Sequence, residues 1–169
     1  MKLVARLAML ITLVYFTFGW AVLWISAFLG TGEMLADAFD LPLDMPVPPM
    51  WAILVGMAMM WPALISLGIG FWALDRILLL KNPQDFAQMG KHLRLCAYAF
   101  LAFWLLNALN VSMQPVVLST HLAQELRPEF VLIDIDIDVV FLVLAAVFFA
   151  ISRSLNQAQE IADENSQFL

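Results

Sequence analysis

Three aspartates at alternate positions have the residue type and spacing that most directly suggest chemistry. Asp134, Asp136 and Asp138 lie in "LIDIDIDVVF", immediately before the apolar run "LVLAAVFFAIS". Carboxylates grouped at a membrane edge can bind a cation or exchange a proton. A carboxylate can also cap a helix, because it accepts hydrogen bonds from free N–H groups of the first turn and lies at the positive end of the helix dipole. We favour the cap, because a tight cation site needs further oxygen or imidazole ligands. A cation or proton site and a partner contact are the alternatives.

A second polar group consists of amides inside an apolar segment. Asn107 and Asn110 are followed by Gln114 in "WLLNALNVSMQPVVL". Unpaired polar groups in hydrocarbon are costly, so these side chains must face protein or water. Hydrogen bonds between helices are the favoured interpretation, and a substrate or quinone-like pocket is the alternative.

Other residue types give little support to catalysis or cofactor binding. The single cysteine, Cys96, excludes an intrachain disulfide and any Cys-rich metal motif. His92 and His121 are expected on opposite sides of the membrane, where they cannot share one metal or haem. No phosphate-binding glycine loop and no nucleophile elbow is present in the sequence. We therefore expect no catalytic residue, no metal and no cofactor.

The composition identifies the solvent of this chain as the lipid bilayer. Of its 169 residues, 63% are hydrophobic, and the mean hydropathy is +0.89. Such a chain is too apolar for a water-soluble fold. The formal net charge of -6 argues against nucleic acid as a direct partner, because phosphates are bound by clustered Lys and Arg.

Four apolar segments are long enough to cross a membrane, which takes roughly 20 helical residues. The sequence predicts an all-α protein with four transmembrane helices in a single domain, residues 1–169. The expected helices cover residues 3–29, 51–80, 93–118 and 137–163.

Basic residues predict the orientation, because Lys and Arg in short loops stay on the cytoplasmic side. Of the 8 basic residues, only Arg127 falls in a loop on the other side. Both termini are therefore expected in the cytoplasm, and helix 4 is expected to extend into it. The residues assigned to the cytoplasmic side are Lys2, Arg6, Arg76, Lys81, Lys91, Arg94 and Arg153.

Prolines and glycines predict local departures from regular helix. Pro62 should bend the second helix, because it lacks an N–H group and clashes with the preceding turn. Ser66, Gly68 and Gly70 should allow another helix to approach closely. The loop between the second and third helices is expected to break at Asn82-Pro83 and at Gly90, and the first outer loop is expected to hold at most a short surface helix.

The end of the chain has an apolar edge outside the expected membrane segment. In "SRSLNQAQEIADENSQFL" apolar residues recur at spacings near three and four, with the acidic residues mostly elsewhere. An exposed apolar edge needs a partner, which can be this protein's own loop or another subunit. The residues expected to contact it include Leu155, Ala158, Ile161 and Phe168.

The stretch "LDRILLLKNPQDFAQMGKHLRLCAYAFLAF", together with the ending "ISRSLNQAQEIADENSQFL", resembles a bacterial family of four-helix membrane proteins called domain of unknown function number 2975. The resemblance implies four membrane helices in the bacterial inner membrane and no established catalytic residue. Some relatives are encoded beside small helix-turn-helix regulators, which implies a cytoplasmic protein partner. The matching residues are Phe86, Lys91, Arg94, Glu164, Asn165 and Phe168.

These observations predict a non-catalytic interaction protein, an accessory or regulatory subunit of a larger membrane assembly. Its expected partners are membrane lipid, another membrane protein or a second copy of itself, and a cytoplasmic regulator. The alternative is a small cation channel or transporter-like oligomer, for which Asp134, Asp136 and Asp138 could attract cations.

Overall fold

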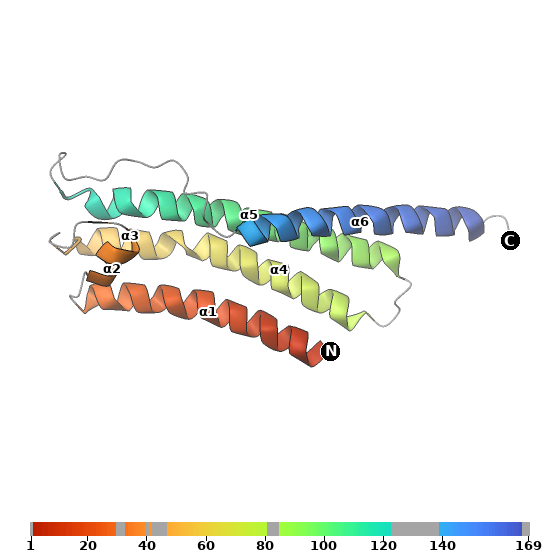
Figure 1. Ribbon diagram of the computed structural model, residues 1–169, viewed down its shortest axis with the longest axis horizontal. Coiled ribbons are helices and arrows are strands. Elements are labelled where there is room, and N and C mark those ends of the chain that lie inside the picture. The colour runs from red at the N-terminus through yellow and green to blue at the C-terminus, as the bar shows by residue number, and fades with distance from the viewer. Residues whose placement is uncertain are drawn as a thin grey trace. The chain divides into compact units, whose positions relative to one another are not determined.

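The computed structural model describes residues 2–29, 33–39, 41, 47–80, 85–122 and 139–166. These residues form helices and no strand (Figure 1). Four helical segments are long and apolar enough to span a membrane: Lys2–Phe28, Met50–Leu79, Phe86–Ser119 and Val139–Asn165. The chain is therefore an all-α, multi-pass membrane protein, as its hydropathy predicted. The helices in order are α1 (Lys2–Phe28), α2 (Glu33–Ala38), α3 (Met50–Met59), α4 (Trp61–Leu79), α5 (Phe86–Ser119) and α6 (Val139–Ser166).

The third spanning helix begins earlier than expected, at Phe86 instead of residue 93. The expected break at Gly90 is wrong, because this glycine lies inside α5. Asp85 starts the helix: its side chain accepts a hydrogen bond from the backbone N–H of Gln88 at 3.1 Å, and its carbonyl accepts one from Met89 at 3.1 Å. A capped first turn outweighs the modest cost of one helical glycine.

The second span is interrupted at Met60, between α3 and α4. Pro62 has no N–H group and so cannot donate to the carbonyl of Ala58, which ends regular α-helical bonding at this point. The chain resumes helical bonding when the N–H of Leu64 donates to the carbonyl of Met60 at 3.1 Å.

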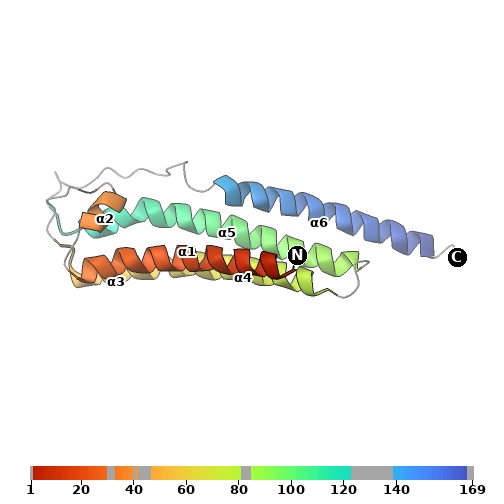
Figure 2. The ribbon, with the colours of Figure 1, turned by 60° about the horizontal axis from the view of Figure 1, so that its bottom comes forward.

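The chain forms two compact units. Unit 2 comprises Leu10–Leu64 and Leu105–Ile137, and its core gathers side chains from α1, α2, α3 and α5. Leu35 and Ala36 of α2 are buried in this core, whereas the other four residues of α2 are exposed, so α2 is the short surface helix that the sequence predicted, with one face anchored in the core (Figure 2). Phe39 meets Trp20 edge to face, with ring centroids 6.4 Å apart.

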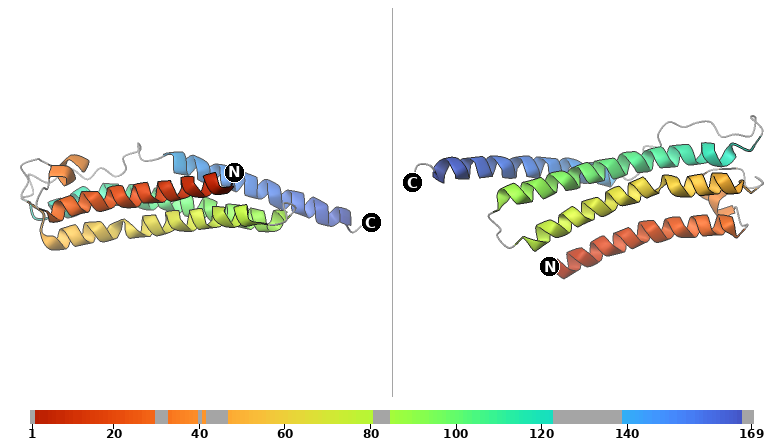
Figure 3. Two further views of the ribbon diagram at one scale, coloured as in Figure 1. Left: turned by 90° about the horizontal axis from the view of Figure 1, so that it is seen from below. Right: turned by 180° about the vertical axis from the view of Figure 1, so that it is seen from behind.

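Unit 1 comprises Met1–Met9, Ile65–Trp104 and Asp138–Leu169. In it, α5 lies beside both α4 and α6 (Figure 3). Phe100 and Phe103 are buried and contact phenylalanine rings of α4 and α6. A methyl group at Gly70 would lie 2.5 Å from the Phe100 ring, and Ser66 donates to the carbonyl of Ala99 at 2.7 Å. A small residue and a hydroxyl thus hold α4 close to α5.

Candidate functional site

Unit 2 contains a hydrogen-bonded group of amides between α3 and α5. Gln114 is fully buried, and its Nε2 donates to the carbonyl of Gly56 at 2.8 Å and to Oδ1 of Asn110 at 2.9 Å. Nδ2 of Asn110 contacts Sδ of Met60 at 3.5 Å. These bonds place Gln114 and Asn110 where the sequence predicted polar links between helices, and they join an amide of α5 to the backbone of α3.

Two accepting oxygens determine the orientation of the Gln114 amide. Because Nε2 faces both of them, exchanging N and O would place Oε1 against two other oxygens. Oε1 itself is buried and has no hydrogen-bond partner among the described residues. A methyl group on Gly56 would clash with Trp24 and lie 2.6 Å from this Oε1. Glycine is therefore required where α1, α3 and α5 meet.

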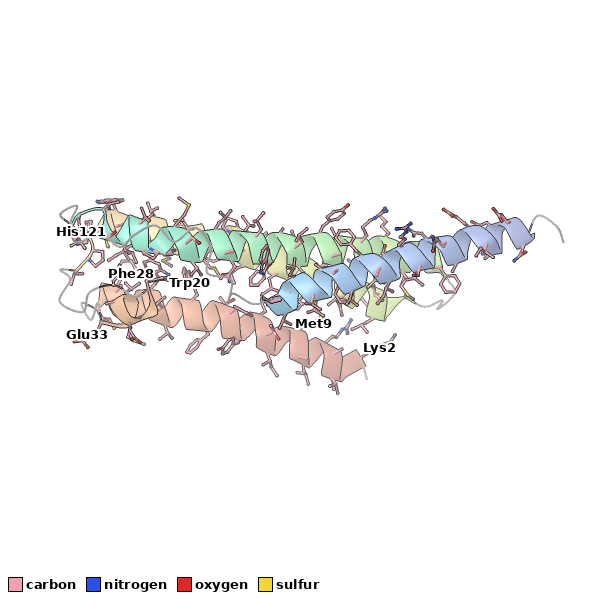
Figure 4. The ribbon with its side chains drawn as sticks, turned by 45° about the horizontal axis from the view of Figure 1, so that its top comes forward. Lys2, Met9, Trp20, Phe28, Glu33 and His121 are labelled. Carbon is pink, nitrogen blue, oxygen red and sulfur yellow. The ribbon has the colours of Figure 1, made fainter. Side chains whose placement is uncertain are left out.

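Two tryptophans of α1 border a cavity of about 150 Å³ beside this contact. Trp24 is 1% exposed, and the indole N–H groups of Trp20 and Trp24 have no hydrogen-bond partner in the described residues. Figure 4 labels Trp20 on α1, together with Phe28 at the end of that helix. The residues around the cavity are Thr17, Trp20, Ala21, Trp24, Met57, Met60, Trp61 and Leu64.

A second cavity of unit 2, of about 410 Å³, shares Trp20 and Met60 with the first. Asn107 lies on its wall. Among the described residues on the walls of these two cavities there is no carboxylate, histidine, lysine or arginine. The described walls of the two cavities are mainly apolar, so they suit apolar molecules.

Unit 1 has a polar contact of its own, between α5 and α6. Ser152 of α6 donates to the carbonyl of Gly90 at 2.8 Å, and a methyl group on Gly90 would lie 2.6 Å from Oδ1 of Asn156. This contact borders a cavity of about 410 Å³ whose wall includes Arg94 and Arg153. Two of the chain's few cations therefore lie on the wall of one cavity.

The start of α1 carries an ion pair with α4, also in unit 1. The guanidinium of Arg6 donates to both carboxylate oxygens of Asp75, from Nε at 2.5 Å and from Nη2 at 3.2 Å. Next to it, the guanidinium of Arg76 lies over the Trp72 ring, 5.1 Å from the centroid. The side chains of Arg6 and Asp75 are partly exposed, as expected for charged side chains near the end of a membrane helix.

His92, His121 and Cys96 are not on the walls of these cavities. Asp134, Asp136 and Asp138 are outside the described residues, although α6 begins directly after them at Val139. His92 meets Trp72 edge to face, and His121 follows the end of α5 (Figure 4). Among the described residues, no three His, Cys, Asp or Glu side chains are grouped as metal ligands. Cys96 is buried, and its thiol donates to the carbonyl of Gly70 at 3.3 Å.

The apolar edge at the end of α6 includes Leu155, Ala158 and Ile161. Leu155 and Ala158 are partly buried, whereas Ile161 is 59% exposed. Phe168 lies outside the described residues.

Sequence reasoning did not find the ion pair of Arg6 with Asp75, the cavity beside Trp20 and Trp24, or the position of Arg94 and Arg153 on the wall of one cavity. Opposite charges near the ends of two spans were a usable signal for the ion pair. The cavities had no such signal, because a tryptophan or an arginine near a membrane boundary is ordinary in any helix of this kind.

The fold and these sites define a small four-span α-helical membrane protein with neutral cavities in one unit and a basic cavity in the other. No protein-family model matches the chain, and no curated protein or solved structure does so either. The resemblance to domain of unknown function number 2975 therefore stays a prediction.

Proposed function

We propose that the protein is a non-catalytic accessory or regulatory subunit of a larger membrane assembly in the bacterial inner membrane. In this proposal both termini are cytoplasmic, and the end of α6 binds a partner protein there. Membrane lipid surrounds the spans, and the partner is another membrane protein or a cytoplasmic regulator.

The observation that carries the proposal is the exposed apolar edge of α6. Beyond Ser152 this helix contains Arg153, Glu160, Asp163 and Glu164, so it is too polar to lie in hydrocarbon. Ile161 is nevertheless 59% exposed on it. Burying an isoleucine side chain contributes about 1.5 to 3 kcal/mol, which favours its contact with another protein over contact with water.

The test is purification of the tagged chain from its native membranes in mild detergent, followed by mass spectrometry of what remains bound. A stoichiometric foreign protein is expected. Ile161→Glu should release it, because a carboxylate in an apolar interface is not compensated. Gln159→Glu is the matched control, since Gln159 lies two residues before Ile161, on the opposite side of the same helix, and gains the same charge. This control should keep the partner.

Retention of the partner by a folded Ile161→Glu variant would contradict the docking role of this edge. Recovery of copies of this chain alone, together with cation flux in reconstituted vesicles, would instead support the alternative of a small cation channel.

A further inference from the structure

We propose that the cavity between α5 and α6 in unit 1 binds the phosphate headgroup of an anionic phospholipid through Arg94 and Arg153. This inference goes beyond the proposed function, because it assigns a lipid-binding site that is independent of any partner protein.

The close contact at Gly90 brings the two arginines to one cavity. Ser152 donates to the Gly90 carbonyl at 2.8 Å, and Asn156 packs where a side chain on Gly90 would stand. Arg94 follows Gly90 by four residues, so both lie on the same face of α5. Arg153 directly follows Ser152 on α6. The helix contact thus places both cations on the wall of one cavity of about 410 Å³.

No carboxylate in the described part of the chain compensates the two charges at this cavity. The residues on its wall are Arg94, Phe149, Ala150, Ser152, Arg153 and Asn156, with no carboxylate among them. Within the described residues, neither arginine forms an ion pair, whereas Arg6 has Asp75. A guanidinium presents N–H groups in a fork that matches two phosphate oxygens. Two unpaired guanidinium groups on one cavity therefore suit a phosphate.

The surroundings favour a lipid as the source of that phosphate. The apolar run of α6 ends at Ile151, so the cavity lies where apolar sequence gives way to polar sequence. Phe149 forms an apolar part of the cavity wall and packs edge to face on Tyr98, with ring centroids 4.9 Å apart. Tyr98 and Val147 are exposed nearby along α5 and α6, where acyl chains can lie. Basic pockets between membrane helices bind anionic headgroups for these same reasons.

The experiment measures lipid retention by the full chain in mild detergent, using native mass spectrometry with phosphatidylglycerol or phosphatidylcholine as the probe. We expect phosphatidylglycerol to be retained in preference to phosphatidylcholine. Arg94→Gln and Arg153→Gln should each weaken that retention about tenfold, as expected for loss of a charged hydrogen-bond donor. Arg153→Lys should recover part of it, because the charge returns without the fork.

Lys91→Gln is the matched control, because it removes a cation that is exposed on α5 but absent from the cavity wall. A loss equal to that of the arginine variants would show general charge attraction and overturn the site. Unchanged retention in the double arginine variant would overturn it as well. Inorganic phosphate that displaces phosphatidylglycerol at millimolar concentration would reject lipid as the ligand. Both arginines are exposed, so either variant should fold, and detergent melting verifies this.

Discussion

The amide nitrogen of Gln114 lies 2.8 Å from the backbone oxygen of Gly56 and donates a hydrogen bond that joins α5 to α3. The residue is fully buried, so water cannot replace this bond. An amide without a hydrogen-bond partner costs free energy in an apolar environment. Rotations of α5 that would separate Gln114 from Gly56 are therefore disfavoured, so the bond also determines how α5 is rotated against α3.

Gly56→Ala should lower the free energy of unfolding by about 1 to 3 kcal/mol, because the added methyl group enters space held by Trp24 and Gln114. Gly68→Ala is the control. Nothing lies within 4 Å of a methyl group there, so this change should be neutral or stabilise α4 by up to about 1 kcal/mol. Thermal melting followed by circular dichroism in detergent measures both. Equal melting temperatures for the two variants would contradict the packing described here.

Gln114→Leu and Asn110→Leu should each destabilise the protein, and their effects should not add. The two side chains share a hydrogen bond of 2.9 Å, so once one is replaced the other has already lost that partner. A double-mutant cycle should give a coupling free energy of about 0.6 to 2 kcal/mol. Strict additivity would show that the bond contributes nothing to stability.

Asn107→Leu should cost less than Asn110→Leu in the same melting experiment. Both side chains are buried, but Asn107 lies on the wall of a cavity, whereas Asn110 is bonded to Gln114. Removing a bonded buried amide leaves its partner unsatisfied, which is the larger penalty. A larger loss at residue 107 would point to an unrecognised partner of that amide.

Reversing the charge of Arg6 by Arg6→Asp should lower the melting temperature in detergent, because two carboxylates then face each other between α1 and α4. Adding Asp75→Arg should recover most of the lost melting temperature, because it restores an ion pair in which the acidic and basic residues have exchanged positions. Both effects should shrink in high salt, since the side chains are partly exposed. No recovery in the double variant would argue that the two residues do not interact.

The orientation predicted from basic residues can be tested with single cysteines in a Cys96→Ala background. Glu33 and Gln88 are exposed positions in α2 and in the first turn of α5. An impermeant thiol reagent added to intact cells should label Glu33→Cys and leave Gln88→Cys unlabelled until the membrane is opened. The reverse pattern would invert the proposed topology.

The four spans were predictable from sequence because hydropathy is local: a run of about 20 apolar residues has the length and the transfer free energy to cross a bilayer whatever it packs against. The same logic predicted that Asn110 and Gln114 need partners. Sequence alone also located the polar end of α6, although the aspartates before Val139 and the terminal Phe168 lie outside the described residues.

Tertiary structure decided which neighbour each residue meets. Gly68 and Gly70 look alike in the sequence, yet of these two only Gly70 lies against another helix. Gly90 does not break α5; it lies inside this helix, where α6 contacts it. These outcomes depend on how each helix is rotated and how far it is shifted along its neighbour. Rotation and shift follow from the fit of many side chains at once, and no window of sequence contains that information.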